Sequence, residues 1–281
     1  MTTQQLPLIV IEGADGAGTT TQTSRLVDWI NRTVEVGQPF ATGIRQPTSN
    51  PIGTFIRQIL TGGVVVESNL ARQLLFTADR YEHAQKVILP KLAAGEIVVC
   101  DRYSLSTAIY LAASEPRYRC NRFGCAWTNE EHSIHPSFAK RMSPQPPADR
   151  LHEHEADNRE VELLKMAFAW NRWAPMPLLT IVLDVLPEVA EERRARRGGK
   201  PELFEQLAFQ RRVCQLYSNS RHVLLNGDFF DESSRAGNPL LEPVVIVNGN
   251  QDENTVAGEV YRLAEHALAR FEERRRMVAG T

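Results

Sequence analysis

A short stretch near the N-terminus combines glycines, threonines and a carboxylate in the spacing of an anion-binding turn. An apolar run from Leu6 to Ile11 predicts a buried strand before it, and a helix is predicted from Thr21 onward. Between such elements, backbone N–H groups converge on an anion and glycines allow its close approach. The pattern is G-x-x-x-x-G-T-T, a P-loop in which Thr19 replaces the usual lysine and Thr20 stands where a Mg²⁺ ligand belongs. The predicted phosphate-binding residues are Gly13, Ala14, Asp15, Gly16, Ala17, Gly18, Thr19, Thr20 and Thr21.

Two charged residues follow another apolar run, Ile97 to Cys100, which also predicts a buried strand. An acid at the end of such a strand, here Asp101, is typical of the carboxylate on the Mg²⁺ side of P-loop enzymes. The adjacent Arg102 can hold a phosphate through paired hydrogen bonds. The alternative is an Asp–Arg surface pair that caps the next helix, predicted from Ser104 onward.

An aromatic side chain and a guanidinium share one face of the longest helical pattern, residues 67–94. Phe76 and Arg80 lie four residues apart, which places them side by side on a helix. An aromatic ring beside a guanidinium can stack a nucleobase and donate a hydrogen bond to it. A phenylalanine on an amphipathic helix is also an ordinary core residue, so both interpretations stay open.

A proline-rich loop, residues 45–53, follows the second predicted strand, residues 39–44. It leaves the carboxyl end of that strand, the edge at which ligands bind in parallel sheets. A short helix then carries Arg57 and Leu60. The alternative is a surface connection whose arginine is solvated.

Four arginines end the helix predicted over residues 188–197: Arg193, Arg194, Arg196 and Arg197. Gly198 and Gly199 follow them, so the cluster has the composition of a mobile flap that closes on phosphates and excludes water. The alternative is a solvated helix face on which neighbouring glutamates pair with the arginines.

Residues 115–158 interrupt the alternation of strands and helices and predict an irregular insertion with at most short helices. It holds a possible set of zinc ligands: Cys120, Cys125, His132 and His135. Two cysteines and two histidines can bind Zn²⁺ tetrahedrally, but this spacing is not that of a standard zinc finger. The alternative is two free thiols and solvent-facing histidines.

The whole chain predicts an α/β protein with a five-stranded parallel sheet and helices on both faces, because five apolar strands alternate with helices. Its 281 residues are 42% hydrophobic with a net charge of −2, which gives no reason to expect a nucleic-acid partner. No apolar run approaches a membrane span and no signal peptide opens the sequence, so a cytoplasmic protein is expected. We expect one domain over residues 1–281, containing the 115–158 insertion, an arginine-rich lid at 187–202 and a second insertion at 227–242.

In this order, the motifs resemble those of thymidylate kinase, a family of P-loop nucleoside monophosphate kinases. The resemblance rests on the glycine-rich turn, Arg45-Gln46-Pro47, Phe76 to Arg80, Asp101-Arg102-Tyr103 with Tyr110, and the arginine flap. It implies the three-layer P-loop kinase fold, transfer of the ATP γ-phosphate to dTMP with Mg²⁺, and a homodimer.

The resemblance also implies roles for individual residues. The implied catalytic set is Asp15, Asp101, Arg102, Arg193, Arg196 and Arg197. Thr20 and Asp101 would organise Mg²⁺. Phe76 would stack the thymine ring, Arg80 would donate to its carbonyl, and Tyr110 would crowd the 2′ position. The implied acceptor-binding residues are Arg45, Arg57, Leu60, Phe76, Arg80, Arg102, Thr107 and Tyr110.

Two departures from the family pattern bear on activity. Thr19 replaces the P-loop lysine, and Gln46 replaces a glutamate common in the family. An arginine from the flap would restore the lost positive charge, since such arginines contribute about 10³–10⁵ in rate. The leading hypothesis is therefore a dTMP kinase. The alternatives are a nucleotide-binding regulatory protein with little or no activity, and a kinase for a modified pyrimidine deoxynucleotide.

Overall fold

The computed structural model describes residues 6–33, 40–114, 118–121, 124–127, 153–198, 202–226 and 244–279. Its centre is a five-stranded sheet in the order β2-β3-β1-β6-β7, and every neighbouring pair is parallel. This confirms the predicted parallel α/β sheet. The strands are β1 (Leu8–Gly13), β2 (Ala41–Arg45), β3 (Ile97–Asp101), β6 (Leu179–Asp184) and β7 (Val244–Asn248).

Strand β1 lies in the middle of the sheet and is buried on both faces. Alternate side chains point to opposite sides. Ile9 and Ile11 pack in the cluster that contains residues of α1 (Thr19–Thr33), while Leu8 and Val10 pack in a second cluster with residues of η1 (Ala84–Ile88) and α4 (Leu89–Ala93). A run of six buried residues is the expected sequence of a parallel strand covered on both faces. The P-loop therefore starts from a central strand that is buried along its whole length.

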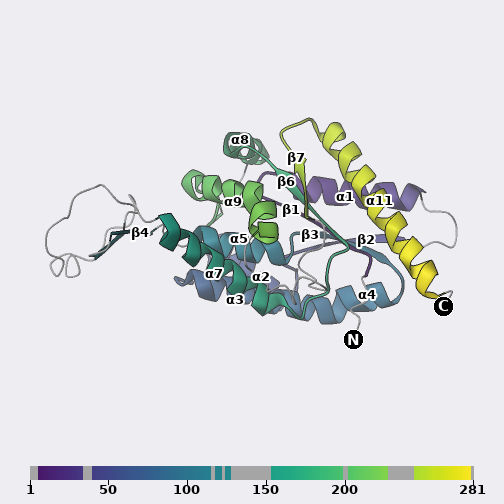
Figure 1. The fold of residues 1–281 in the computed structure, drawn as a ribbon, viewed down its shortest axis with the longest axis horizontal. Helices are drawn as coiled ribbons and strands as arrows, with labels where there is room; N and C mark the ends of the chain where they lie inside the picture. Colours follow the sequence, from purple (N-terminus) through teal and green to yellow (C-terminus); the bar gives the residue numbers. More distant parts are fainter. Residues whose placement is uncertain are drawn as a thin grey trace.

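Helices cover both faces of the sheet (Figure 1). On one side α1 (Thr19–Thr33) lies beside α11 (Glu253–Ala279), and the rings of Trp29 and Tyr261 stack with centroids 5.0 Å apart. The other helices are α2 (Pro51–Leu60), α3 (Asn69–His83), α4 (Leu89–Ala93), α5 (Ser104–Ser114), α7 (Glu153–Asn171), α8 (Pro187–Arg197) and α9 (Leu207–Asn226).

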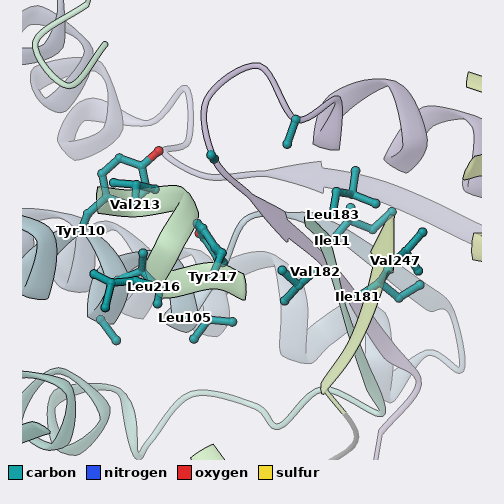
Figure 2. Packing of buried hydrophobic residues seen from close by; sticks show 14 of the residues in the cluster. Ile11, Leu105, Tyr110, Ile181, Val182, Leu183, Val213, Leu216, Tyr217 and Val247 are labelled. Atoms are coloured by element: carbon teal, nitrogen blue, oxygen red, sulfur yellow. The ribbon is translucent and has the colours of Figure 1, made fainter. Parts of the chain in front are cut away.

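Helices α5 and α9 pack against each other and join the sheet core. Figure 2 shows Leu105 and Tyr110 of α5 near Leu216 and Tyr217 of α9. The buried carboxylate of Glu12, at the end of β1, accepts hydrogen bonds from Tyr103 N (2.8 Å), Ser106 Oγ (2.5 Å) and Tyr217 OH (3.0 Å). Glu12 thus fixes both helices to the strand that ends in the P-loop.

The helical pattern over residues 67–94, in which Pro90 predicts a kink or interruption of the last turns, is divided into three segments. The chain forms α3, a π-helical segment η1 (Ala84–Ile88) and then α4. Pro90 has no N–H and its ring excludes the carbonyl of residue 86 from the usual position, which favours a widened turn just before it.

The prediction that residues 115–158 hold only loops and short helices is also wrong. Strands β4 (Tyr118–Asn121) and β5 (Gly124–Trp127) pair antiparallel, and α7 already begins at Glu153. The zinc prediction stays a prediction: Cys120 and Cys125 are paired opposite each other in this hairpin, while His132 and His135 lie outside the described residues. Within the described ranges, no helix has the length and apolar character needed to span a membrane.

Candidate active site

The glycine-rich turn has the conformation of a phosphate-binding loop. Gly16 and Gly18 adopt positive φ angles of 92° and 95°, and α1 begins directly afterwards at Thr19. A Cβ at Gly16 would lie 2.4 Å from the carbonyl oxygen of Ala190, so glycine is also needed for α8 to approach the turn. This conformation suits a phosphate, because the N–H groups in the first turn of α1 have no partner within the helix and can donate to an anion.

A cavity of about 490 Å³ opens over this turn. Its lining brings residues 15–22 together with the chain after β7, a segment that the sequence analysis did not single out. Five guanidinium groups also line it, those of Arg45, Arg102, Arg193, Arg194 and Arg197. So much positive charge around a glycine-rich turn suits a polyphosphate.

Arg194, from α8, is the most deeply placed of these arginines. It is 8% exposed and donates to the carbonyl of Asp15, and its Nη2 has no hydrogen-bond partner among the described residues. Arg193 lies 3.4 Å from the carbonyl of Ala17, and Arg197 pairs with Glu205. Arg194 is not in the catalytic set that the family resemblance implies, although Ala190, one helical turn earlier, is buried on the same side.

Arg196 does not reach the cavity. It is exposed and pairs with Glu192, one turn earlier on α8, at 2.6 Å. Helical geometry explains the difference, because Arg193 and Arg197 are four residues apart on the face toward the P-loop, whereas Arg196 is turned toward solvent. The predicted grouping of Arg193, Arg196 and Arg197 is thus not reproduced: residues 187–197 form a regular helix, and two of the three arginines line the cavity.

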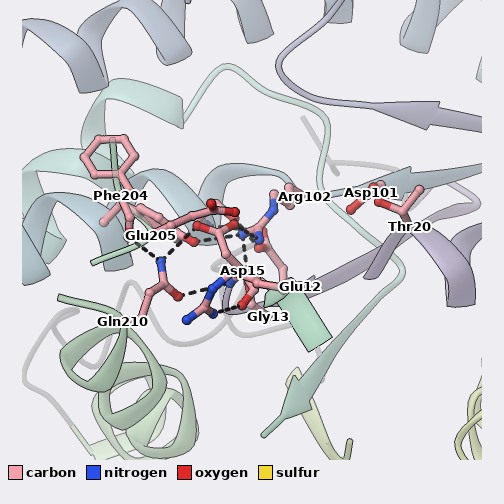
Figure 3. Close-up of polar contacts among 12 residues, drawn as sticks. Glu12, Gly13, Asp15, Thr20, Asp101, Arg102, Phe204, Glu205 and Gln210 are labelled. Atoms are coloured by element: carbon pink, nitrogen blue, oxygen red, sulfur yellow. Dashed lines mark hydrogen bonds and ion pairs between the residues drawn. The ribbon is translucent and has the colours of Figure 1, made fainter. Parts of the chain in front are cut away.

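The oxygen atoms of two predicted metal ligands meet on the other side of the turn. Thr20 Oγ1 donates to Asp101 Oδ2 at 2.5 Å, as Figure 3 shows. Asp101 is 2% exposed, Arg45 Nε lies 3.5 Å from its Oδ2, and its Oδ1 has no partner in the described part of the chain. A hydroxyl and a carboxylate with an unused buried oxygen fit Mg²⁺, which prefers oxygen ligands and binds through one or two carboxylates plus water and phosphate. Among the described residues no group of three or more His, Cys, Asp or Glu forms an all-protein metal cage.

Asp15 is held on both of its carboxylate oxygens (Figure 3). Arg102 Nη2 lies 2.6 Å from Oδ1, and Gln210 Nε2 donates to Oδ2 at 2.9 Å. Arg102 also donates to the carbonyl of Gly13 at 2.7 Å, and Gln210 Nε2 to that of Phe204 at 2.7 Å. Arg102 itself has a φ of 68°, an uncommon value for a side chain of this size. This network fixes the P-loop carboxylate relative to β3 and α9.

Gln210 is a site residue that the sequence analysis missed, because it contacts Asp15 across 195 residues of sequence. We expect Gln210→Leu to reduce catalytic turnover about tenfold, since Asp15 loses one of its two fixed partners while the leucine fills the same volume. The exposed Gln215→Leu on the same helix is the matched control. Steady-state kinetics of both variants test this, and equal turnover in the two would contradict it.

A second, narrower pocket of about 90 Å³ adjoins the first. Helix α3 contributes Gln73, Phe76 and Arg80, and α5 contributes Thr107 and Tyr110. Arg57 and Leu60 of α2 and Glu202 and Phe204 close its sides. All predicted acceptor-binding residues therefore gather in one place, and Asp15, Arg45 and Arg102 line both pockets.

The side chains of this second pocket are tightly fixed. Phe204 packs edge-on against Tyr110 with ring centroids 5.4 Å apart. Burial lowers the pKa of the Arg80 guanidinium. The pKa of the Glu202 carboxyl is raised, mainly by partial burial and to a smaller extent by the negative charge of Asp15. Arg57 donates to the carbonyl of Pro47 at 2.6 Å, which holds the 45–53 loop against α2.

The comparisons with known proteins agree with this geometry. The family model described as thymidylate kinase matches residues 11–122. A probable thymidylate kinase of Pyrobaculum aerophilum is 30% identical over 212 residues, 75% of this chain and 81% of that protein. A probable thymidylate kinase of Pyrococcus abyssi is 29% identical over 213 residues, 74% of this chain and 80% of that protein. The solved thymidylate kinase of Candida albicans is similar in fold, with a TM-score of 0.60 and 23% identity over 94% of this chain and 92% of that chain. This chain belongs to the thymidylate kinase family.

Proposed function

We propose that this protein is an ATP-dependent thymidylate kinase that transfers the γ-phosphate of ATP to dTMP, giving dTDP and ADP. The observation that carries the proposal is the junction of the two pockets. Asp15, Arg45 and Arg102 line both of them, so a donor phosphate and an acceptor phosphate placed in the two pockets meet between the same side chains.

The reaction is an in-line phosphoryl transfer. An oxygen of the acceptor 5′-phosphate forms a bond to the γ-phosphorus, and the bond from that phosphorus to the β–γ bridging oxygen breaks, leaving its electron pair on ADP. Little covalent chemistry is required of the protein, so positioning and charge neutralisation dominate. Arg45 and Arg102 neutralise the acceptor phosphate, and Arg193, Arg194 and Arg197 neutralise the donor phosphates.

Thr20 and Asp101 would hold the Mg²⁺ that this family uses. When bound, the ion supplies neutralisation of charge on the donor phosphates. The chain's own contribution is the short Thr20–Asp101 contact, which fixes both oxygens at the start of α1.

The missing P-loop lysine is replaced, in this proposal, by an arginine of α8. Thr19 lines the donor cavity but carries no charge, whereas Arg194 approaches the same turn through the Asp15 carbonyl. Its unpartnered Nη2 leaves donors for a phosphate oxygen.

The direct test is ADP release in a coupled assay with purified protein, Mg²⁺ and ATP. We expect dTMP to give the highest kcat/KM, ahead of dUMP and dGMP. A panel that includes modified pyrimidine monophosphates separates the dTMP kinase from a kinase for a modified nucleotide. Turnover at background level with every deoxynucleotide would discard the kinase proposal.

Thr19 favours one other function, a nucleotide-binding regulatory protein with the 115–158 insertion as its partner surface. That function predicts binding of ATP or dTMP by calorimetry without product, and a partner that is lost when the insertion is deleted. By family resemblance we also propose a homodimer and a cytoplasmic location. Sedimentation as a monomer in analytical ultracentrifugation would contradict the homodimer.

A further inference from the structure

One side chain in the acceptor pocket carries a polar group that the protein itself does not use. Gln73 is 2% exposed and lines the pocket, yet its Nε2 has no hydrogen-bond partner among the described residues. A buried amide donor without a partner destabilises the folded protein, because it has given up its hydrogen bonds to water. Such a group in a ligand pocket is explained if a ligand satisfies it.

The position of Gln73 on α3 places it beside the residues expected to hold a base. Phe76 is three residues further along the helix and Arg80 seven, so all three project from one face, and all three line the same pocket. Gln73 and Phe76 therefore face the same pocket from neighbouring turns of α3, and a planar base would stack on the ring of Phe76.

Arg80 has little capacity left to read a base by itself. Its Nε donates to Gln46 (2.8 Å), its Nη1 to Thr107 (3.0 Å) and Asn171 (2.7 Å), and its Nη2 to the carbonyl of Tyr103 (2.8 Å). A guanidinium has five N–H groups, so one remains. Four of the five N–H groups of Arg80 thus hold the inner wall of the pocket, and one is left to donate to a ligand.

We propose that Gln73 is a specificity-determining residue that hydrogen-bonds the edge of the pyrimidine base, an inference that rests on the proposed function. Thymine and uracil present a carbonyl oxygen next to an N–H, and a carboxamide presents the complementary N–H and carbonyl. Cytosine presents an amino group in place of that carbonyl. A polar group left unpaired by the wrong base is the strongest source of discrimination available to such a pocket.

Calorimetric binding of dTMP, dCMP and 2-deoxyribose 5-phosphate tests this independently of turnover. Gln73→Met keeps the side-chain length and removes the amide. We expect it to raise the Kd for dTMP about tenfold, to reduce the preference for dTMP over dCMP by a similar factor, and to leave the Kd for 2-deoxyribose 5-phosphate unchanged. The matched control is Gln58→Met, which replaces an exposed glutamine of α2.

Gln73→Glu provides a second test if the methionine variant does not fold. A carboxylate accepts but does not donate at neutral pH, so its preference must shift from dTMP toward dCMP. The inference is overturned if either folded variant keeps the wild-type base preference within twofold, or if affinity for the base-free sugar phosphate falls as much as affinity for dTMP. Wild-type binding of dTMP without turnover would reject only the kinase proposal, whereas no binding of dTMP would reject both.

Discussion

Replacing Arg194 with methionine is expected to reduce kcat by about a thousandfold, while Arg196→Met on the same helix keeps kcat within about twofold of the wild type. Arg194 is buried against the P-loop with an unused Nη2, whereas Arg196 is exposed and paired with Glu192. Surface pairs of the second kind contribute little. The two variants therefore remove the same charge from the same helix and differ only in which way it faces.

The measurement is steady-state turnover with saturating ATP and dTMP, together with calorimetric affinity for dTMP. Affinity for dTMP should change little, because Arg194 lines the donor cavity and not the acceptor pocket. A thermal unfolding scan controls for loss of the Arg194 bond to the Asp15 carbonyl. Retention of more than a tenth of wild-type kcat by Arg194→Met would contradict the assigned role, as would an equal loss in Arg196→Met.

A rescue experiment connects Arg194 with the missing lysine. Adding Thr19→Lys to Arg194→Met returns a cation to the position from which the P-loop normally supplies it. If α8 provides the replacement charge, the double variant should recover at least about tenfold in kcat, and the effects of the two changes should be non-additive. No recovery in a folded double variant would show that Arg194 acts in another way.

The sheet could be predicted from the sequence because its signal is local. Strands β1, β3, β6 and β7 coincide with apolar runs, and β1 is followed immediately by the glycine turn. Pro90 in the sequence marks the place where the long helix is interrupted, but no local pattern indicates the π-helical widening of η1 before it.

Some residues of the candidate site can likewise be recognised from local sequence motifs, and others cannot. Residues 13–20, Asp101 and Phe76 stand in motifs, and the structure brings them together at the carboxyl edge of the sheet. The periodicity of α3 already contains Gln73, three residues before Phe76, and that of α8 already contains Arg194, four residues after the buried Ala190. The three- and four-residue spacing of a helix, counted from Phe76 and from Ala190, therefore places Gln73 and Arg194 on the faces that line the pockets.

The contacts around Asp15 could not be read from local patterns. Gln210 meets Asp15 across 195 residues and Arg102 meets it across 87. Glu12 binds Tyr217 across 205 residues. Such pairs depend on the strand order β3-β1-β6, which the alternation of strands and helices leaves open.

The second large effect is expected at Arg102. Its side chain is 16% exposed and bridges Asp15 and the Gly13 carbonyl at the junction of the two pockets. In the proposed reaction Arg102 faces the acceptor phosphate, and removing one group that stabilises charge in the transition state costs about 10²–10³ in rate. Arg102→Met should therefore lower kcat/KM for dTMP by about 10²–10³, a larger factor than the loss of an exposed charge such as Lys86, whose pair with Glu82 lies at the surface.

A double-variant cycle with Asp15→Asn separates the two contributions of Arg102. If Arg102 acted only by positioning Asp15, the double variant would be no slower than the worse single variant. Because Arg102 also lines the acceptor pocket, we expect a further loss of dTMP affinity in Arg102→Met that Asp15→Asn does not share. Equal dTMP affinity in the two single variants would remove Arg102 from the acceptor-phosphate site and leave it as a support for the P-loop alone.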